Sequence, residues 1–600
     1  MTERFLMKIT LCQLNSQFVH SALAPWYLAA AAEQLCAVPH TLRVAQGTVN
    51  QTDEALLALL CAPAPELLGL SCYIWNVETL RRLLPKLRAA LPNTAIVLGG
   101  PEVSFCAEAF LAQNPAADYI LCGEGERSFA ALADALAGAG RLEEVPGLCR
   151  RTGHGIVCAP PPAPLDELFD PYTDAYFAAL GGRIPYIETT RGCPFTCAFC
   201  LSGRSDRLRC FSLEAAFVSL RRLAASGAKT IKFIDRTFNA NEPRARRIWE
   251  FLAQERAEGR IPEGVCFHFE VAADLFSPEC LAFLATVPAG LFQFEAGLQS
   301  FHPETLAAVQ RKTDLEKLCR NLSALLAPGN LHLHIDLIAG LPYEDFATFA
   351  DSFDRAFALG AHQLQLGFLK LIHGSALRRD ADAYGMRCAA AAPYEITENR
   401  WLTPADLARL TRAEQALDLI YNSGRYRRSL PYLLTLWQGG AFAFFSAFSA
   451  MLALLGAYPA AEAVAECFYR FGCGIAGIKA PLLRDLLALD TLSSRRAMRL
   501  PDFLKVRDDR LRRINQLVRT GDEHLPGAAQ LPEKFHAGKI GFCILYSGYG
   551  CCSDSEVLAL FDYTDRDPVT GAYAVATLPL REALGLPMPE GAACCRLQTP

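Results

Sequence analysis

Residues 188–200 read ETTRGCPFTCAFC and place Cys193, Cys197 and Cys200 in a C-x3-C-x2-C pattern directly after a strand-like segment. The chain has 23 cysteines, and at that abundance this spacing is expected by chance only about 0.03 times. Three thiolates from one short loop can ligate three irons of a [4Fe–4S] cubane and leave the fourth iron open to a ligand. The motif therefore predicts an iron–sulfur site.

Zinc is the alternative metal for three cysteines in one loop. A structural zinc site needs a fourth ligand and usually a second cysteine or histidine pair. Only Cys210 lies close in the sequence, and the loop also carries Arg191, Gly192 and Pro194, which do not suit a buried cluster of structural cysteines. Iron–sulfur is the preferred interpretation, and zinc remains open.

The cysteine loop follows the first of six strand-like segments between residues 184 and 375. The segments are PYIETT, TIKFID, CFHFEV, LFQFEA, LHLHIDLIAG and HQLQLGFLKL. They recur about every 27–40 residues, with helix-like stretches between them, which is the spacing of βα barrels. We predict a partial (β/α)6 barrel over residues 184–400, with its chemistry at the carboxyl ends of the strands.

Residues 1–150 alternate short apolar runs with amphipathic stretches. The runs are MKITLCQL, TLRVA, LLGLS, TAIVLGG and DYILCGEGE. This alternation predicts an open, mostly parallel, Rossmann-like α/β sheet. From Ala159 the chain reads APPPAPLDELFDPYTDAYF, and so much proline argues against regular structure. Residues 151–183 are therefore predicted to form a linker.

The last third of the chain, residues 401–600, has a helical pattern that returns to α+β character near its end. No charged residue occurs from Ser429 to Ala461, a stretch long enough to cross a bilayer. Its Ala, Ser and Gly content and its weak basic flanks fit a buried helix as well, and we expect no membrane partner. The adjacent Cys551 and Cys552 are interpreted as loop cysteines.

The composition is that of a well-packed globular protein. Of the 600 residues, 52% are hydrophobic and 20% are charged, and the formal net charge is −5. This charge argues against nucleic acid as a partner, so we expect a small-molecule substrate held in a pocket. The N-terminus has no signal-peptide pattern, and the scattered cysteines fit core positions better than a disulfide scaffold. We predict a cytoplasmic protein.

The segment RGCPFTCAFC at the end of the first barrel strand resembles the radical S-adenosylmethionine (SAM) superfamily signature, C-x3-C-x-aromatic-C, with Phe199 as the aromatic residue. The resemblance implies that Cys193, Cys197 and Cys200 hold a [4Fe–4S] cluster. Such a cluster reduces SAM to methionine and a 5′-deoxyadenosyl radical, which abstracts hydrogen from a substrate. The resemblance also implies an electron donor such as flavodoxin or ferredoxin.

Later strand ends resemble the SAM-contacting segments of the same superfamily. FEAGLQS is similar to its Gly-Val-Gln-Ser segment and IDLIAGLPYED to its Gly-Leu-Pro segment, whereas FIDRTF lacks the usual Gly-Gly-Glu. Among the implied contacts, Glu270 on the third strand and Gln299 on the fourth are preferred for binding the ribose or the carboxylate of SAM. The full implied set is Phe199, Asp235, Glu270, Gln299, Ser300, Ile338, Gly340 and Pro342.

The first domain resembles the cobalamin-binding domain that precedes the barrel in many radical SAM proteins. The matching segments are APWYLAAAAEQ, LGLSCYIWN, VLGGPEVS and DYILCGEGE, in which glycines after strands allow a bulky ligand to approach closely. The Asp-x-His-x-x-Gly ligand motif is missing around His20, His40 and His154, so the lower axial position of cobalt is expected to be open or taken by another group. The implied cobalamin contacts are Tyr27, Ser71, Asn76, Gly99, Gly100, Pro101, Gly123, Glu124, Gly125 and Glu126.

Together these resemblances imply a cobalamin-dependent radical SAM enzyme with an uncharacterised C-terminal module. The first hypothesis is methyl transfer to an unactivated carbon or phosphorus centre. Two alternatives stay open: a cobalamin-dependent rearrangement or cyclisation without methyl transfer, and a non-catalytic cobalamin or redox sensor.

Overall fold

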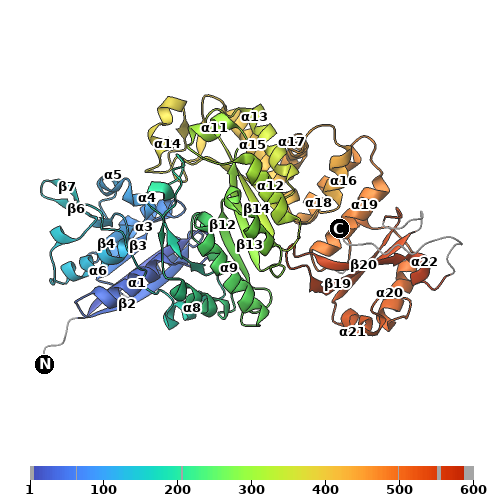
Figure 1. Cartoon of the computed structure of the whole chain (residues 1–600), viewed down its shortest axis with the longest axis horizontal. Coiled ribbons are helices and arrows are strands. Elements are labelled where there is room, and N and C mark those ends of the chain that lie inside the picture. Colours follow the sequence, from blue (N-terminus) through green and yellow to red (C-terminus); the bar gives the residue numbers. More distant parts are fainter. Residues whose placement is uncertain (1–5, 63, 205–206, 498, 550–555, 587–600) are drawn as a thin grey trace. The chain divides into compact units, whose positions relative to one another are not determined.

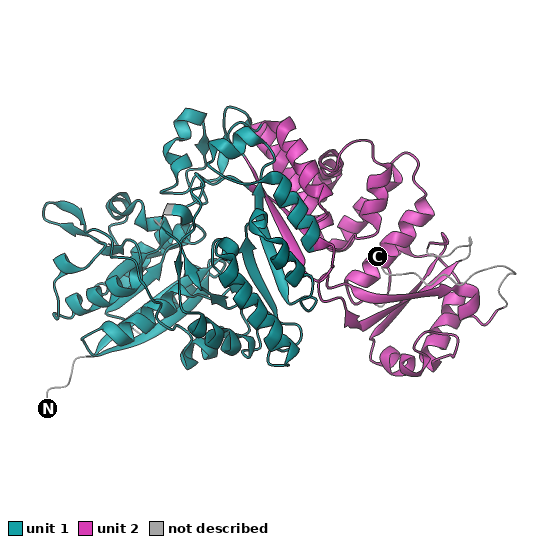
Figure 2. Cartoon of the chain, viewed as in Figure 1, with its two compact units in different colours: residues 1–325, 340–344, 368–403 teal, residues 326–339, 345–367, 404–600 magenta. Residues whose placement is uncertain are grey.

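The computed structural model describes residues 6–62, 64–204, 207–497, 499–549 and 556–586, so that Cys551 and Cys552 lie outside the described residues. The chain divides into two compact units, which Figure 2 separates by colour. Unit 1 comprises residues 1–325, 340–344 and 368–403, and unit 2 comprises residues 326–339, 345–367 and 404–600.

The N-terminal part of unit 1 is a seven-stranded sheet with the order β2-β1-β3-β4-β5-β6-β7 (Figure 1). Strands β1 to β5 pair in parallel, and β6 and β7 add an antiparallel edge. The predicted Rossmann-like sheet is confirmed, with its strand order reversing between β1 and β3, where such sheets bind ligands. Its strands are β1 Met7–Asn15, β2 His40–Thr48, β3 Leu67–Ser71, β4 Ala95–Gly99, β5 Tyr119–Leu121, β6 Leu148–Thr152 and β7 Gly155–Cys158. Its helices are α1 Ala24–Leu35, α2 Asp53–Cys61, α3 Val77–Ala90, α4 Pro101–Ser104, α5 Ala107–Gln113 and α6 Gly125–Leu136.

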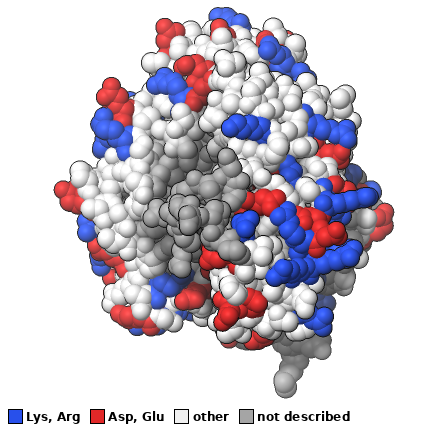
Figure 3. Space-filling model, turned by 90° about the vertical axis from the view of Figure 1, so that its right-hand side faces the viewer, with Lys and Arg blue, Asp and Glu red and all other residues white. Residues whose placement is uncertain are grey.

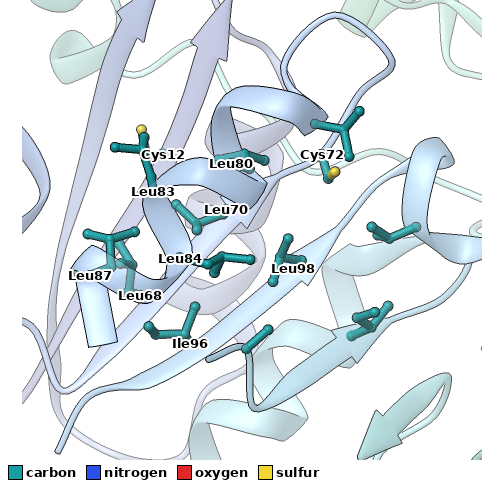
Figure 4. Packing of buried hydrophobic residues seen from close by; sticks show 14 of the residues in the cluster. Cys12, Leu68, Leu70, Cys72, Leu80, Leu83, Leu84, Leu87, Ile96 and Leu98 are labelled. Carbon is teal, nitrogen blue, oxygen red and sulfur yellow. The ribbon is translucent and has the colours of Figure 1, made fainter. Parts of the chain in front are cut away.

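Apolar side chains of this sheet point alternately to two helical layers, because successive residues of a strand face opposite sides. Leu67 belongs to the core that includes Phe129 of α6, whereas Leu68 and Leu70 belong to the core that includes Leu83 of α3. Figure 4 shows this second core. Burial on both faces explains why these strands read as continuous apolar runs.

The prediction that residues 151–183 lack regular structure is wrong at both ends of that stretch. Strand β7, Gly155–Cys158, extends the first sheet, and helix α7, Asp174–Leu180, follows the last proline of the stretch. The Thr173 hydroxyl accepts a hydrogen bond from the Tyr176 amide at 3.3 Å and caps this helix. Proline excludes a helix only where it occurs. The chain is therefore irregular from the end of β7 to the last proline and becomes helical after that proline.

The predicted series of six βα units is confirmed, and its first four strands lie in unit 1. They pair in parallel in the order β8-β11-β12-β13. These strands are β8 Tyr186–Ile187, β11 Thr230–Phe233, β12 Cys266–Val271 and β13 Phe292–Gln299. The helices between and after them are α8 Leu213–Ala224, α9 Glu242–Ala257, α10 Pro278–Leu284, α11 Pro303–Ala308 and α12 Leu315–Leu326. The series continues with β14 His332–Ala339, α13 Phe346–Ala358 and β15 Gln363–Phe368. It is followed by α14 Ala376–Arg379 and by β16 Arg387–Cys388 and β17 Ile396–Glu398, which form a separate antiparallel pair.

The C-terminal part of unit 2 is helical first and α+β afterwards, as predicted. Its antiparallel sheet β18-β19-β20 packs on one face against Leu489 and Leu492 of α19 and on the other against Ile514 and Val518 of α20. The helices are α15 Pro404–Leu417, α16 Ser429–Leu436, α17 Ala441–Leu452, α18 Ala461–Cys473, α19 Ala480–Ser494, α20 Arg510–Thr520, α21 Leu531–His536 and α22 Leu580–Ala583. The strands are β18 Ile540–Leu545, β19 Val557–Arg566 and β20 Tyr573–Pro579.

The uncharged stretch from Ser429 to Ala461 is broken in the structure. Among the described residues, no single helix is both long and apolar enough to cross a membrane. Only Ser429–Leu436 and Ala441–Leu455 reach that length and hydropathy together, and they are bent by 109° at the break. Phe444, Phe445 and Phe448 of this stretch are fully buried, as expected for a core helix.

Charged side chains of both signs occur on the face of the molecule shown in Figure 3. Lys and Arg are interspersed with Asp and Glu there, as the small net charge of −5 leads one to expect.

Candidate active site

The cysteine loop begins where the first barrel strand ends. Strand β9, Thr190–Arg191, pairs with β10, Arg209–Cys210, so the loop leaves and re-enters the fold at one place. Gly192 turns the chain with φ +95°, and all three cysteines of the loop are half-buried free thiols. The Cys200 amide donates to the Cys197 carbonyl at 3.0 Å, which curls the loop between these two residues.

The loop folds back on itself at Gly203, where no side chain fits. A Cβ atom at this position would lie 1.7 Å from the backbone carbonyl oxygen of Phe195. We expect Gly203→Ala to displace the loop and to lower the iron content of the reconstituted protein several-fold, since a 1 Å misplacement of a site is costly. The measurement is iron and sulfide analysis after anaerobic reconstitution.

Gly153→Ala is the control for that variant, because Gly153 lies in an exposed hairpin turn where an added Cβ meets nothing within 4 Å. Equal iron loading of the wild-type protein and both variants would contradict the role given to Gly203.

Two backbone hydrogen bonds and one arginine hold the loop in place. The Ala198 amide donates to Val309 O and the Ala198 carbonyl accepts from the Leu377 amide, both at 2.8 Å. The Arg311 guanidinium lies 3.8 Å from Cys197 Sγ and also donates to the Gly297 carbonyl of β13. Burial raises the pKa of Cys197 while the Arg311 charge opposes that shift, and the nearby Cys200 and Cys193 add to it. These contacts fix the Cys197 side of a loop whose three thiols are of the kind that hold an iron–sulfur cluster.

Asp235 braces the strand end below the loop. Its carboxylate is fully buried and accepts hydrogen bonds from the Thr189 amide at 2.9 Å and from the Thr189 and Thr190 hydroxyls at 2.7 Å. Both oxygens are thus used inside the protein. This arrangement does not support the prediction that Asp235 contacts SAM, because its polar atoms already have internal partners.

Burial raises the pKa of Asp235 to about 6, although the bonds from Thr189 oppose the shift. Because this pKa is higher in the folded state than in the unfolded state, protonation of Asp235 stabilises the folded protein. The stabilisation is complete below the unfolded-state pKa and is lost as the pH rises through the folded-state pKa. We expect Asp235→Asn to remove this dependence. From pH 4 to pH 6, the free energy of unfolding of the wild type should fall by about 2 kcal/mol relative to that of the variant. Urea unfolding of the apoproteins checks this, and a difference that does not change with pH would contradict it.

Arg191 is the centre of an ionic network between the loop and the first domain. Its guanidinium contacts Glu188 at 2.9 Å, Glu126 at 3.0 Å and Glu124 at 3.2 Å. Arg209 makes a further close ion pair with Glu124. Burial works against the charged form of Arg191, but the carboxylates around it raise its pKa, so the cation persists. The network ties the glycine loop after β5 to the strand that leads into the cysteines.

A cavity of about 530 Å³ lies on the other side of this network, at the carboxyl ends of the parallel strands. Eight of the ten predicted cobalamin contacts line it. These are Tyr27, Ser71, Gly99, Gly100, Gly123, Glu124, Gly125 and Glu126. Tyr186, Glu188, Arg191, Ile234 and Arg236 from the strand series complete its wall.

Asn76 and Pro101 are not among the residues that line this cavity. Asn76 is fully buried, and its amide donates to Leu14 O and Ser71 O at 3.0 Å while accepting from the Tyr73 amide at 2.8 Å. Pro101 is the first residue of α4, where its fixed φ suits a helix start. The structure gives both residues a role in local folding and does not support their prediction as cofactor contacts.

The cavity wall fits a large ligand with polar edges. Gln13 is 7% exposed, and its Oε1 has no hydrogen-bond partner among the described residues although its Nε2 donates to Asn15. A buried acceptor of this kind is satisfied by a donor on a ligand. A Cβ at Gly99 would meet only the Leu121 carbonyl within 4 Å, so the missing side chain leaves room. Tyr73 and Trp75 stack at 4.3 Å on the same wall. The residues therefore fit a bulky cofactor such as cobalamin.

His20 also lines the cavity, although no ligand motif surrounds it. Its Nδ1 lies 2.7 Å from the Tyr186 hydroxyl, and Tyr186 is the first residue of β8. Burial, together with the Lys232 charge, lowers the pKa of His20, which favours the neutral ring. His20 is not part of an Asp-x-His-x-x-Gly motif, as the sequence analysis stated. It nevertheless lies in the wall of the cavity.

The predicted SAM contacts on the later strands separate into two groups. Glu270 lies 3.8 Å from Arg236 of the cavity wall, and Gln299 has a left-handed backbone with φ +76° and a buried Oε1 without a hydrogen-bond partner among the described residues. Strain of this kind is typical of functional sites. Both stay predictions.

The second group has local structural roles. The Ser300 hydroxyl donates to Glu344 at 2.6 Å, and the Gly340 and Pro342 carbonyls accept hydrogen bonds from the Asn399 and Thr305 side chains. These polar atoms are taken up by the protein itself. Phe199 is half-buried within the cysteine loop, and Ile338 lies in β14 of unit 2. Their predicted SAM contacts are not tested by this geometry.

Several residues of the site carry no signal that the sequence analysis used. Glu188 and Arg191 adjoin the cysteine motif at a strand end, and Gln13 lies near the end of the first strand, so position alone could have marked them. Arg311 lies 114 residues from Cys197 in the sequence, and nothing local to it indicates this contact.

Three family models match successive parts of the chain. The B12 binding domain model matches residues 11–133, and the Radical SAM superfamily model matches residues 187–356. A model described as a protein of unknown function, DUF4080, matches residues 382–543. The first two coincide with the cavity domain and with the strands that carry the cysteine loop.

Curated relatives match parts of the chain. The chain is 28% identical over 363 residues to the cobalamin-dependent radical SAM methyltransferase TokK of Streptomyces tokunonensis, which covers 57% of this chain and 52% of TokK. It is 32% identical over 159 residues to the anaerobic magnesium-protoporphyrin IX monomethyl ester cyclase of a Synechocystis species, which covers 25% of this chain and 32% of the cyclase. The chain thus spans about half of TokK and a third of the cyclase.

A solved structure shows the same fold. The cobalamin-dependent S-adenosylmethionine radical enzyme OxsB, with aqua-cobalamin and S-adenosylmethionine bound, superimposes with a TM-score of 0.55 at 14% identity. The match covers 89% of this chain and 83% of OxsB.

Proposed function

We propose that this chain, whose residues 11–133 match the B12 binding domain model and whose residues 187–356 match the Radical SAM superfamily model, is an enzyme that cleaves SAM reductively and methylates an unactivated centre of a small molecule. Its [4Fe–4S] cluster would be held by Cys193, Cys197 and Cys200, and its cobalamin by the cavity of the first domain. When bound, the cluster supplies the electron for SAM cleavage and cobalamin supplies a methyl carrier.

One observation carries this proposal: a single short run of residues serves both cofactor sites. Glu188 and Arg191 line the cavity, and Arg191 is two residues before Cys193. The two sites therefore lie next to each other within unit 1. A protein that only stored either cofactor would have no need for this adjacency.

The chain's own residues position and enclose the cofactors. Arg311 holds the Cys197 side of the loop against β13, and the Arg191 network holds the glycine loop of the first domain against the strand series. The Arg191 guanidinium lies over the Tyr27 ring, 5.9 Å from the ring centre, and both residues form part of the cavity wall.

The deciding experiment is anaerobic reconstitution with iron, sulfide and hydroxocobalamin, followed by turnover of SAM labelled in its methyl group. We expect bound iron and cobalt, and 5′-deoxyadenosine when a strong reductant is present. Label in the product of a correct small-molecule substrate supports methyl transfer. A protein loaded with cluster and reductant that never forms 5′-deoxyadenosine would instead be a cobalamin or redox sensor.

A cyclisation or rearrangement without methyl transfer is the second candidate activity. It is supported by the 32% identity to the magnesium-protoporphyrin IX monomethyl ester cyclase over 159 residues. The two candidates differ in one readout, because the methyl label stays out of the product when no methyl group is transferred.

The surroundings of the enzyme follow from its chemistry. We propose a flavodoxin or ferredoxin as electron donor, because SAM cleavage requires a low-potential electron. We also propose a cytoplasmic location, where reducing conditions keep the three thiols of the cluster loop available to iron.

A further inference from the structure

Three cysteines lie side by side at the antiparallel edge of the first sheet. Cys149 of β6 pairs with Cys158 of β7 in the strand register and forms a disulfide with it. Cys122, directly after β5, places its Sγ 3.9 Å from Cys149 Sγ. A thiol in van der Waals contact with a disulfide is the arrangement that precedes thiol–disulfide exchange.

One of the three cysteines is exposed and the other two are buried. Cys158 is exposed, Cys149 is fully buried and Cys122 is 9% exposed. The sulfur that would leave is thus the one that water can stabilise as a thiolate.

Cys122 is joined directly to the cavity wall. The next four residues, Gly123 to Glu126, all line the cavity, and two of them bind the guanidinium groups of Arg191 and Arg209. The Cys122 amide also donates to the Gly147 carbonyl at 2.9 Å, on the way to β6. A displacement of Cys122 therefore reaches the ionic network and the wall.

We propose that Cys122, Cys149 and Cys158 form a thiol–disulfide exchange site that sets the shape of the cofactor cavity. In the exchange, the Cys122 sulfur loses its proton and bonds to the Cys149 sulfur. The Cys149–Cys158 bond breaks, and the Cys158 sulfur takes up a proton. One disulfide replaces another, so the step needs no external oxidant or reductant. Whether Cys158 is a free thiol or part of a disulfide then changes the position of residues 123–126 in the cavity wall. The effect on the cavity rests on the proposed cobalamin site, whereas the exchange does not.

Two single variants trap the two states. Cys122→Ser permits only the Cys149–Cys158 disulfide, and Cys158→Ser permits only a Cys122–Cys149 disulfide. Cys12→Ser is the matched control, because Cys12 is a buried cysteine of β1 in the same sheet. The full-length proteins are equilibrated anaerobically in glutathione buffers, quenched with acid, alkylated and mapped by peptide mass spectrometry.

We expect the wild type and Cys12→Ser to contain both disulfides, and the oxidised Cys158→Ser protein to contain the Cys122–Cys149 bond. Cys122 that remains fully alkylated in oxidised Cys158→Ser would overturn the exchange, as would zinc that copurifies and is lost on mutation of any of the three cysteines. Hydroxocobalamin titration of the trapped forms should give affinities that differ about tenfold. Equal affinities would overturn the link to the cavity, and absence of binding in every form, with exchange intact, would instead contradict the proposed cofactor.

Discussion

Cys197→Ala is expected to abolish formation of 5′-deoxyadenosine from SAM. Loss of residues that merely support a metal ligand typically costs 10–100-fold, so loss of a ligand itself should cost at least about 100-fold. Arg311 and the backbone bonds of Ala198 fix the Cys197 side of the loop, so this substitution removes a thiol from a well-defined position. The measurement combines iron and sulfide analysis, the cluster absorbance and single-turnover deoxyadenosine yield after anaerobic reconstitution.

Cys210→Ala is the control for this prediction. Cys210 is an exposed cysteine in β10, next to the loop but outside its motif. It should keep the full iron content and the full deoxyadenosine yield. If instead Cys210→Ala loses metal as completely as Cys197→Ala, and the metal is zinc, the four cysteines form a zinc site and the radical chemistry is excluded.

Gly99→Leu is expected to weaken hydroxocobalamin binding strongly while leaving the iron–sulfur cluster intact. Gly99 ends β4, lines the cavity and has an ordinary backbone conformation, and a Cβ there meets only one carbonyl oxygen at 3.7 Å. The protein therefore accommodates a Cβ atom at this position, and we expect the rest of the leucine side chain to occupy ligand space. Steric changes of one or more methylenes in a pocket are worth roughly 10- to 200-fold.

The measurement is equilibrium titration of the apoprotein with hydroxocobalamin, followed by iron analysis of the same sample. Gly153→Leu is the matched control, since it makes the same substitution in an exposed turn of the same domain. Undiminished cobalamin binding by Gly99→Leu would place the cofactor elsewhere. Loss of iron as well as cobalamin would show that the substitution acts through folding rather than through the cavity.

Local patterns were enough to predict the elements of the fold and the metal-binding loop. A strand buried on both faces must be apolar throughout, so the five parallel strands of the first sheet and the six strands of the series could be read directly. The three cysteines of the loop are close in space because they are close in sequence. The glycines after β4 and β5 mark the cavity for a similar reason, since strand ends of a parallel sheet meet at one edge.

Contacts between residues that are distant in the sequence were not foreseen by the sequence analysis. Asp235 has the position of a ligand contact, but its oxygens bind Thr189 and Thr190, about 45 residues earlier. Asn76 follows a strand as a contact would, yet its amide ties β1 to β3. The helix Asp174–Leu180 was missed because a proline-rich stretch was taken as irregular to its end, although proline affects only its own turn.

The amino-acid sequence alone determined the α/β elements, the iron–sulfur loop and the edge of the sheet at which a cofactor binds, because each depends on periodicity or on short spacing. Only the tertiary structure decided which side chains serve the site. The Arg191 network, the Arg311–Cys197 contact and the three edge cysteines join segments as much as 114 residues apart. The unsatisfied oxygen of Gln13 likewise became visible only in the folded chain. A hydrogen bond or a sulfur contact requires an approach within about 4 Å, and folding brings such partners together without leaving any pattern along the chain.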